Sequence, residues 1–347
     1  MKTIAFLTPF VDNRGGGEIF LNNLVNYCNA NSNEWKMVVF TADKSVYTCK
    51  TVNIPAINTY KKLFSHFLEI CRIIDSYGYD YVILNDIYLS QFSLLFSLRL
   101  RNVYSLIHGE IDYIPRSNRL LKKIVAYFRL RLISIGSKKI LSVNKHNCDL
   151  YRNKQMVVKI GNFFTPSYAT SSCEDKEYDF VFCGRFVSLK RIDLIVDTFK
   201  VYREKYNEKS RLLLIGAGEC YPDIQEKIKQ TGMQHYVDMP GYVEHKQIVS
   251  YYQKSKCLLL FSETEGFPTV ILEALQLGLP CIVTDVGSNS EVIKDGINGY
   301  CFPCGTEIEE IAYYMNESLS IDSYCCKESV SKYTISCFLD RFLEVLR

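Results

Sequence analysis

The sequence has no long apolar run, and this absence narrows the classes to which the protein can belong. No segment of the 347 residues approaches the roughly 18 consecutive apolar residues that a membrane span requires. The apolar start at Thr3–Phe10 is too short for the hydrophobic region of a secretory signal, and we interpret it as a buried strand. Any contact with a membrane is therefore expected to be at its surface.

Neither Gly15–Gly17 nor Gly216–Gly218 completes the Gly-x-Gly-x-x-Gly pattern of NAD sites, which counts against a classical NAD-binding site.

The charge balance has no strong excess of either sign. Lysine and arginine number 41 and aspartate and glutamate 38, a formal net charge of +3 that does not indicate a nucleic-acid partner. Among the fourteen cysteines, Cys301 and Cys304 form a lone Cys-x-x-Cys without a second pair at zinc spacing. Cys183, Cys257 and Cys281 lie in apolar runs, where free cysteine acts as a small hydrophobic residue. These features predict a reduced, cytoplasmic protein without a disulfide framework or a metal site.

Short β-branched or aromatic runs alternate with helical stretches along the chain, which is typical of βαβ units and an α/β fold. In the first half we predict helices at Ile19–Ala30 and Leu63–Ser76 and strands at Thr3–Pro9, Lys36–Thr41, Tyr81–Asn85, Val103–His108 and Lys139–Val143. In the second half we predict strands at Tyr178–Gly184, Arg211–Gly216, Val237–Gly241, Lys256–Ser262, Pro280–Thr284 and Tyr300–Pro303.

The pattern is interrupted at Gly161–Lys176, where Thr, Ser, Pro and Asn occur without periodicity. We expect two Rossmann-like domains, at residues 1–163 and 164–330, that face each other across a cleft. The segment 331–347 is predicted to form a helix that packs back across the domains, because its apolar residues recur at helical spacing. These residues are Ile335, Phe338, Leu339, Phe342 and Leu346.

The stretch Ser262–Leu275 carries the strongest chemical signal. A predicted strand ends just before Glu265, Pro268 suits the first turn of a helix, and Glu273 lies within that helix. Ligands of open α/β sheets bind at the carboxyl ends of strands, and a helix N-terminus there attracts phosphate. Glu273 is surrounded by apolar neighbours, so we expect its charge to have a partner such as ribose hydroxyls rather than to lie on the surface.

A second basic element follows the predicted strand Tyr178–Gly184. Arg185, Lys190 and Arg191 precede the predicted helix Ile192–Tyr202. Lys190 and Arg191 lie at the helix N-terminus, where cations are disfavoured, so their placement indicates that an anion such as a diphosphate binds between them. An exposed basic loop is the alternative. The glycine-rich turn at Asp12–Glu18 allows close approach of a ligand but is a weak signal by itself.

These elements together resemble the large retaining glycosyltransferase family 4, which has the GT-B fold. The resemblance spans nearly the whole chain, and its specific part is residues 178–303, where Glu265 and Glu273 are embedded in a Glu-Gly-Phe-Pro motif. The other matching motifs, in order, are Gly15–Gly17, His108-Gly109, Gly184-Arg185 with Lys190, Leu212–Gly218, Gly241–Val243, Gly278–Val283 and Gly287–Gly299.

The resemblance implies that the substrate is a nucleoside-diphosphate sugar, with no other cofactor. Arg185 and Lys190 would neutralise the leaving diphosphate, and Glu273 would bind ribose hydroxyls. Glu265 would hold hydroxyls of the donor sugar. The backbone after Glu265 would also contact the donor, at Gly266, Phe267, Pro268, Thr269 and Val270. The absence of any Asp-x-Asp agrees with a metal-independent donor site.

The resemblance also assigns roles outside this motif. Gly241, Tyr242 and Val243 would line the base pocket. Gly16 and Gly17 would approach the donor phosphates, and His108 would lie near the reacting centre. The chain departs from the family at Asn85-Asp86, where many members have a histidine after the buried strand, so the resemblance does not define the acceptor side.

The implied activity is retaining transfer of a hexosyl or related glycosyl group to a glycan, in cell-surface polysaccharide synthesis. Other readings of the same fold remain open. A catalytically silent GT-B partner subunit would lack the combined set of Arg185, Lys190, Glu265 and Glu273, an inverting enzyme would lack the glutamate pair, and a nucleotide-sugar epimerase would turn over without an acceptor.

The segment from Tyr113 to His146 contains nine lysines or arginines and no acidic residue. A basic amphipathic segment suits an anionic inner-leaflet surface, so we expect the basic residues 116–145 to bind the cytoplasmic face of a membrane and the acceptor to be lipid-linked. The alternative is a helix that buries its apolar stripe in the core and leaves its charges in water. We expect the stripe itself to be core; it comprises Leu121, Val125, Phe128, Leu132 and Ile135.

Overall fold

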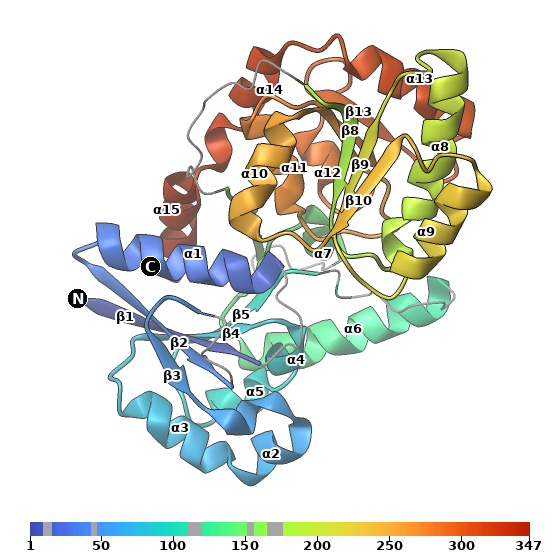
Figure 1. Ribbon diagram of the computed structural model, residues 1–347. Coiled ribbons are helices and arrows are strands. Elements are labelled where there is room, and N and C mark those ends of the chain that lie inside the picture. Colours follow the sequence, from blue (N-terminus) through green and yellow to red (C-terminus); the bar gives the residue numbers. More distant parts are fainter. Residues whose placement is uncertain (10–15, 43–46, 110, 112–118, 151–155, 165–175) are drawn as a thin grey trace. The chain divides into compact units, whose positions relative to one another are not determined.

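A computed structural model describes residues 1–9, 16–42, 47–109, 111, 119–150, 156–164 and 176–347 (Figure 1). The chain divides into two compact units, each built on its own parallel sheet. The N-terminal unit comprises Met1–Thr165 together with Ile335–Arg347, and the C-terminal unit comprises Pro166–Thr334.

The N-terminal unit is built on a seven-stranded sheet with the order β3-β2-β1-β4-β5-β6-β7. All of its strand pairs are parallel. The strands are β1 (Lys2–Thr8), β2 (Trp35–Thr41), β3 (Thr51–Asn53), β4 (Tyr81–Asn85), β5 (Val103–Ile107), β6 (Ile140–Ser142) and β7 (Val157–Lys159). Its helices are α1 (Gly16–Asn31), η2 (Pro55–Asn58), α2 (Tyr60–Ser65), α3 (Phe67–Asp75), α4 (Ile87–Ser90), α5 (Ser93–Ser97), α6 (Arg119–Gly136), α7 (Lys145–Leu150) and α15 (Ile335–Leu346).

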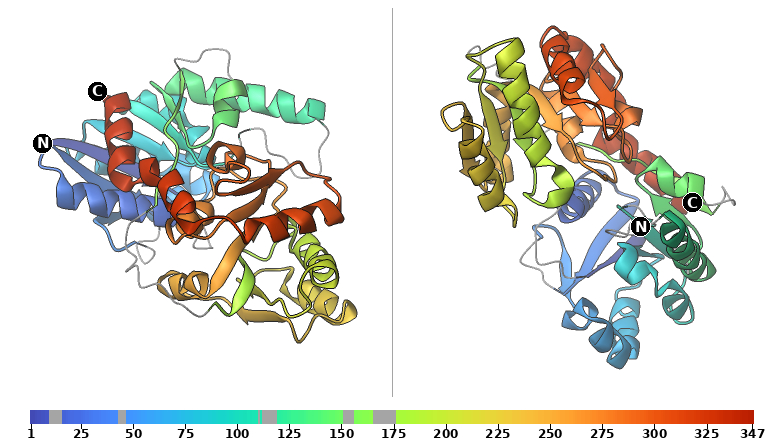
Figure 2. Two further views of the ribbon diagram at one scale, coloured as in Figure 1. Left: turned by 90° about the horizontal axis from the view of Figure 1, so that it is seen from above. Right: turned by 90° about the vertical axis from the view of Figure 1, so that its right-hand side faces the viewer.

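Both faces of this sheet are covered, because successive side chains of a strand point to opposite sides. In β1, Ile4 and Phe6 belong to one buried cluster, and Ala5 and Leu7 belong to another. The first cluster includes α1 and the C-terminal helix α15, which pack side by side (Figure 2). The end of the chain is therefore part of the N-terminal core, where Phe338 is fully buried.

The C-terminal unit is built on a six-stranded parallel sheet with the order β10-β9-β8-β11-β12-β13. Its strands are β8 (Tyr178–Cys183), β9 (Leu212–Ile215), β10 (Val237–Gly241), β11 (Ser255–Leu260), β12 (Cys281–Thr284) and β13 (Gly299–Phe302). Its helices are η3 (Ser188–Lys190), α8 (Ile192–Lys205), α9 (Tyr221–Gln230), α10 (His245–Gln253), α11 (Thr269–Gln276), α12 (Asn289–Val292), α13 (Ile308–Ser318), α14 (Ser323–Ser329) and η4 (Ser331–Tyr333). Helices α8 and α13 pack together, and α11 packs on α14 (Figure 1).

The structure differs from the sequence-based expectation at several elements. Strands β3 and β7 were not predicted; each has three residues, too few to show a period-2 pattern. The predicted helix Leu63–Ser76 is two helices, α2 and α3, because the backbone leaves the helical region at His66, with φ −115° and ψ 16°.

The expectation that the apolar stripe of α6 is core is wrong. Phe128 is 60% exposed, Ile135 57% and Leu132 49%, while Leu121 is also exposed and Val125 is half-buried. The helix faces the core with a different arc, which includes Leu130 and Ile133. The apolar spacing was recognised correctly, but α6 has apolar residues on two arcs and only one of them is covered.

Candidate active site

The order of the C-terminal strands reverses between β8 and β11, which are adjacent although β9 and β10 separate them in the chain. Ligands of doubly wound sheets bind at such a switch point, outside the carboxyl ends of the strands. The segment that leaves β8 carries Arg185 and Lys190, and the segment that leaves β11 carries Glu265. The topology therefore brings together two predicted elements that lie 75 residues apart in sequence.

Lys190 and Glu265 form an ion pair outside the carboxyl ends of β8 and β11. The Lys190 ammonium donates a hydrogen bond to Oε1 of Glu265, and the side chains are only 18% and 10% exposed. Ser262, fully buried, donates from Oγ to the same carboxylate oxygen at 2.6 Å. Thr284 in turn donates to the carbonyl oxygen of Ser262, also at 2.6 Å. Glu265 is thus held by residues at the ends of β11 and β12.

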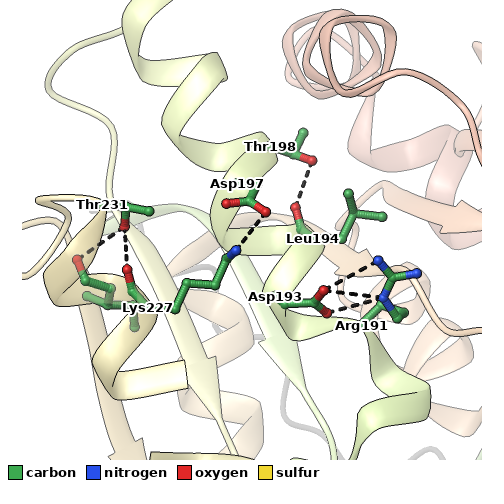
Figure 3. A network of polar contacts seen from close by, with 8 residues as sticks. Arg191, Asp193, Leu194, Asp197, Thr198, Lys227 and Thr231 are labelled. Carbon is green, nitrogen blue, oxygen red and sulfur yellow. Dashed lines mark hydrogen bonds and ion pairs between the residues drawn. The ribbon is translucent and has the colours of Figure 1, made fainter. Parts of the chain in front are cut away.

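Arg191 has carboxylate partners too, contrary to the expectation of a basic pair awaiting an anion. Its Nε lies 3.2 Å from Oδ1 of Asp193, in the first turn of α8 (Figure 3). Its Nη1 lies 3.5 Å from Oε1 of Glu263. Arg191 adopts a left-handed conformation, φ 46°, which is uncommon for a residue with a Cβ. The same figure shows Lys227 of α9 bound to Asp197 of α8 at 2.7 Å, which ties the two helices together.

Arg185 differs from both neighbouring cations. Its side chain is exposed, and no carboxylate pairs with it among the residues that the structure describes. At the switch point, Lys190 and Arg191 are matched by Glu265, Glu263 and Asp193, so Arg185 is the cation with free hydrogen-bonding capacity for an incoming anion.

Helix α11 begins at this edge with Pro268 as its N-cap. No side chain among the described residues caps the helix, so its first backbone N–H groups have no side-chain partner there. Phe267 is buried, with its ring 5.7 Å from that of Tyr333, and fixes the start of the helix. Glu273 is 9% exposed, as expected from its apolar neighbours. Burial, and to a smaller extent the nearby carboxylate of Glu273, raises the pKa of the Cys183 thiol to about 12.

The other predicted donor contacts lie at loops after β10, β11 and β12. Gly241 ends β10 with φ +81°, Tyr242 is 66% exposed and Val243 is half-buried. Gly266, Thr269 and Val270 are half-buried. Gly287 allows the loop after β12 to lie against the backbone of Glu265, since a Cβ there would be 2.0 Å from the Glu265 carbonyl oxygen.

His108 follows β5 in the N-terminal unit, whose own switch point lies between β1 and β4. Its Nε2 is 2.9 Å from Oδ1 of Asn85, and the Asn85 amide Nδ2 donates to Oγ1 of Thr8 at 3.3 Å. The ring of Phe20 lies edge-on, 4.9 Å away. Burial lowers the pKa of His108 to about 4, so the imidazole is neutral at physiological pH. With Nε2–H donating to Asn85, Nδ1 is left as a hydrogen-bond acceptor.

The glycine-rich turn lies partly outside the described residues, which omit Asp12–Gly15. Gly16 and Gly17 begin α1. A Cβ on Gly17 would lie 3.9 Å from Cδ2 of His108, so the structure places Gly17 beside the predicted histidine.

Sequence reasoning missed three supporting residues. Ser262 and Thr8 are small hydroxyl residues at the ends of buried strands, and Asn85 was noted only as a departure from the family. A polar residue at the carboxyl end of an apolar strand is a signal that could have identified all three. No cluster of metal-ligating side chains occurs within the described ranges, and the cysteines there are free thiols.

Two Rossmann-like α/β units with parallel sheets are the architecture of the GT-B glycosyltransferases. The structure is similar to the lipopolysaccharide outer core galactosyltransferase WaaB, with a TM-score of 0.76, 20% identity and 99% of both chains covered. It is also similar to Anabaena Alr3699/HepE in complex with UDP and glucose, with a TM-score of 0.78, 15% identity, and 100% of this chain and 99% of that chain covered. The chain therefore has the GT-B fold.

The family comparison identifies the C-terminal unit more closely. Residues 169–331, within this unit, match the family described as Glycosyl transferases group 1. An uncharacterized glycosyltransferase of Methanocaldococcus jannaschii is 32% identical over 124 residues, 35% of this chain and 33% of the relative. The alignments with the first relatives thus span about a third of those proteins. An uncharacterized glycosyltransferase of Haemophilus influenzae is 23% identical over 313 residues, 86% of each chain.

Proposed function

We propose that the protein is a glycosyltransferase that moves a sugar from a nucleoside-diphosphate sugar to a glycan acceptor. The observation that carries this proposal is the charge arrangement at the β8/β11 switch point. Arg185 is free for an anion there, Lys190 is held by Glu265, and the uncapped start of α11 adds outward N–H groups. Preorganised cations and N–H groups stabilise the negative charge that develops on a departing diphosphate.

The donor-site roles follow from this arrangement. Arg185 would bind the diphosphate as a bidentate fork, and Lys190 would act as a point charge. Glu265, fixed by Lys190 and Ser262, would accept hydrogen bonds from hydroxyls of the donor sugar. Glu273 would bind the ribose, and Gly241–Val243 would contact the base. The HepE structure, whose bound molecules are UDP and glucose, supports a uridine donor as the first to test.

We propose a retaining, metal-independent transfer of a hexosyl group, as in glycosyltransferase family 4. The Glu265…Glu273 spacing supports this assignment, and the absence of Asp-x-Asp is in line with it. Release of nucleoside diphosphate and the anomeric configuration of the product, followed by NMR, test it directly. Loss of activity with EDTA, or an inverted anomer, contradicts the corresponding part of the proposal.

The acceptor is proposed to be a lipid-linked glycan of cell-surface polysaccharide synthesis, reached from the cytoplasmic face of the membrane. The likeness to a lipopolysaccharide galactosyltransferase and the basic residues 116–145 support this assignment. The N-terminal unit would bind the acceptor and the C-terminal unit the donor. Turnover of the sugar nucleotide without any acceptor would instead indicate an epimerase.

Donor binding is tested by thermal shift of the full chain with UDP, GDP, ADP and their common sugar conjugates. A ligand at 100 times its Kd stabilises the folded state by about 2.7 kcal/mol. We expect one diphosphate series to raise Tm, and Arg185→Ala to abolish the rise. The matched control is Lys229→Ala, which also removes one exposed positive charge.

The control is informative because of topology. Lys229 lies in the last turn of α9, and a helix that follows a parallel strand runs back toward the amino-terminal ends of the strands, away from the carboxyl ends where the donor would bind. The Lys229 variant should therefore keep the full shift. A panel in which no nucleotide raises Tm contradicts the proposed donor site and favours a silent GT-B binding subunit.

A further inference from the structure

Helix α6 in the N-terminal unit has an apolar face that no described residue of that unit covers. Its inner arc is core, since Leu130 and Ile133 are 3% and 0% exposed. Its outer arc carries large apolar side chains that are between 44% and 67% exposed. These are Leu120, Leu121, Ile124, Tyr127, Phe128, Leu132 and Ile135.

The outer residues form one continuous surface. Their spacing of three, four and seven positions places them on one side of an α-helix. Helix α5 packs closely on α6, since a Cβ on Gly136 would lie 1.9 Å from the backbone nitrogen of Leu94. Helix α5 therefore extends the surface. The α5 residues Leu94 and Leu98 are themselves 42% and 71% exposed. A contiguous apolar patch of this kind marks an interaction surface.

The charged residues of α6 and of the segment that follows it to His146 are all of one sign. Arg131 lies within the apolar arc and is exposed, and Lys138 and Lys145 are exposed beyond the helix. None of the three pairs with a carboxylate in the described ranges. Arg129 donates to the carbonyl oxygen of Ile111 at 3.0 Å rather than to an acid. The sequence from Tyr113 to His146 contains no acidic residue that could balance these cations.

An apolar arc with cations inside and beside it fits an anionic lipid surface better than other partners. A nucleic acid would leave the apolar residues in water. A second copy of this chain in a two-fold dimer would bring the same basic patch against itself, and like charges oppose such contacts. No described helix combines the length and apolarity of a membrane span, so the contact lies in the plane of the interface.

We propose that α6 docks the N-terminal unit on an anionic membrane by inserting its outer apolar arc among the lipid headgroups. Arg131 and Lys138 contact lipid phosphates at the same time. Such helices bury their apolar face about 5–10 Å into the interface, and each nearby cation adds attraction to anionic lipid. This docking goes beyond the proposed transfer reaction, and it does not depend on a bound donor.

The test is co-flotation of the full chain with vesicles of phosphatidylglycerol and phosphatidylcholine at low salt, without nucleotide. The diagnostic variant is Phe128→Ser/Ile135→Ser. The matched control is Tyr324→Ser/Ile297→Ser in the C-terminal unit, where the side chains are equally exposed at 68% and 55%. We expect wild type and control to float, and the α6 variant to lose about 100-fold in partition coefficient, roughly tenfold for each large side chain.

Two further measurements separate the apolar and charged contributions. Arg131→Glu should weaken flotation, and pure phosphatidylcholine vesicles should bind far less protein. Phe128→Trp should show a blue-shifted emission that brominated lipids quench, while the native Trp35, which is buried, should not be quenched. All of these exposed substitutions are expected to leave folding intact.

Several results would overturn the proposal. Absence of wild-type flotation with anionic vesicles is one, and equal binding of the α6 variant and the control is another. A soluble dimer that Phe128→Ser/Ile135→Ser converts to monomer would show that the surface binds a second copy instead. If no nucleotide raises Tm, the donor site fails but vesicle binding is not affected. Failure of the donor site and failure of docking are therefore distinguishable.

Discussion

The bond between Asn85 and His108 allows the protonation state of the histidine to be changed by one substitution. Burial holds the pKa of His108 at about 4, and Asn85 offers only a neutral acceptor. Asn85→Asp would place a carboxylate at hydrogen-bond distance from Nε2. At an effective dielectric constant of about 20, opposite charges about 4 Å apart attract by roughly 4 kcal/mol. This energy raises the pKa of His108 by about 3, to about 7.

If a neutral His108 is required near the reacting centre, the variant acquires a new pH dependence. The wild-type kcat/KM should not respond to His108 between pH 5.5 and 8.5, whereas Asn85→Asp should be about tenfold less active at pH 6 than at pH 8. The measurement is a pH–rate profile combined with 15N NMR of the imidazole. Asn31→Asp, at an exposed site, makes the same chemical change and should keep the wild-type profile.

Two results would refute this reasoning. An imidazole that still titrates near 4 in Asn85→Asp would show that the 2.9 Å contact does not exist in solution. An imidazole that titrates near 7 with an unchanged rate profile would show that the charge of His108 is irrelevant to catalysis. The double variant Asn85→Asp/His108→Gln should lose the new inflection, which identifies the histidine as its source.

Three further predictions concern stability. In the unfolded chain His108 binds a proton below about pH 6.5, whereas in the folded protein it does so only below about pH 4. The free energy of unfolding should therefore fall by roughly 3 kcal/mol as the pH drops from 6.5 to 4. His108→Gln should remove this decrease when unfolding is followed by the fluorescence of Trp35. Phe338→Ala should destabilise the N-terminal unit by about 3–5 kcal/mol in the same assay, because Phe338 is fully buried. Ser336→Ala, at an exposed position of the same helix, should destabilise it by less than about 0.5 kcal/mol. Equal effects would contradict the placement of α15 in that core. Gly216→Ala should lower the free energy of unfolding, followed by circular dichroism, by about 3 kcal/mol or more, since its Cβ would lie 1.8 Å from the Gly184 carbonyl oxygen. Gly232→Ala should lower it by about 1–2 kcal/mol, because Gly232 also has a positive φ of +74° but has open space around it. A similar loss of stability in both variants would refute the clash at Gly216.

The regular part of the fold was predictable because its signals are local. Strand β4 matches the prediction at both ends, and the helix after Arg191 begins where it was expected. These elements have apolar runs or periodic patterns long enough to read. The break between α2 and α3 at His66 has no such signal, since neither proline nor glycine is present there. Short strands such as β7 form because a neighbouring strand offers free hydrogen-bonding groups, which sequence periodicity does not record.

The covered face of α6 shows a different limit. Its sequence is apolar on two arcs, and periodicity assigns both to a helix without saying which one meets the sheet. The inner arc with Ile133 is covered because β5 and β6 are adjacent and present Ile107 and Ile140 to it. Strand order is a property of the whole sheet, so it was not available from the segment alone.

The pair of Lys190 and Glu265 also depends on strand order, and it changes how substitutions at the donor site must be interpreted. The two residues were assigned separate roles from their motifs, but the adjacency of β8 and β11 makes them one unit. Lys190→Ala would leave the largely buried Glu265 carboxylate without its cation, so lost nucleotide binding in that variant would not demonstrate a phosphate contact. Arg185 supports no carboxylate in the described ranges, so its removal leaves no such unpaired charge. The Arg185 variant therefore reports on the bound anion, and a double-mutant cycle of Lys190→Ala with Glu265→Gln is required to separate the pair from the ligand.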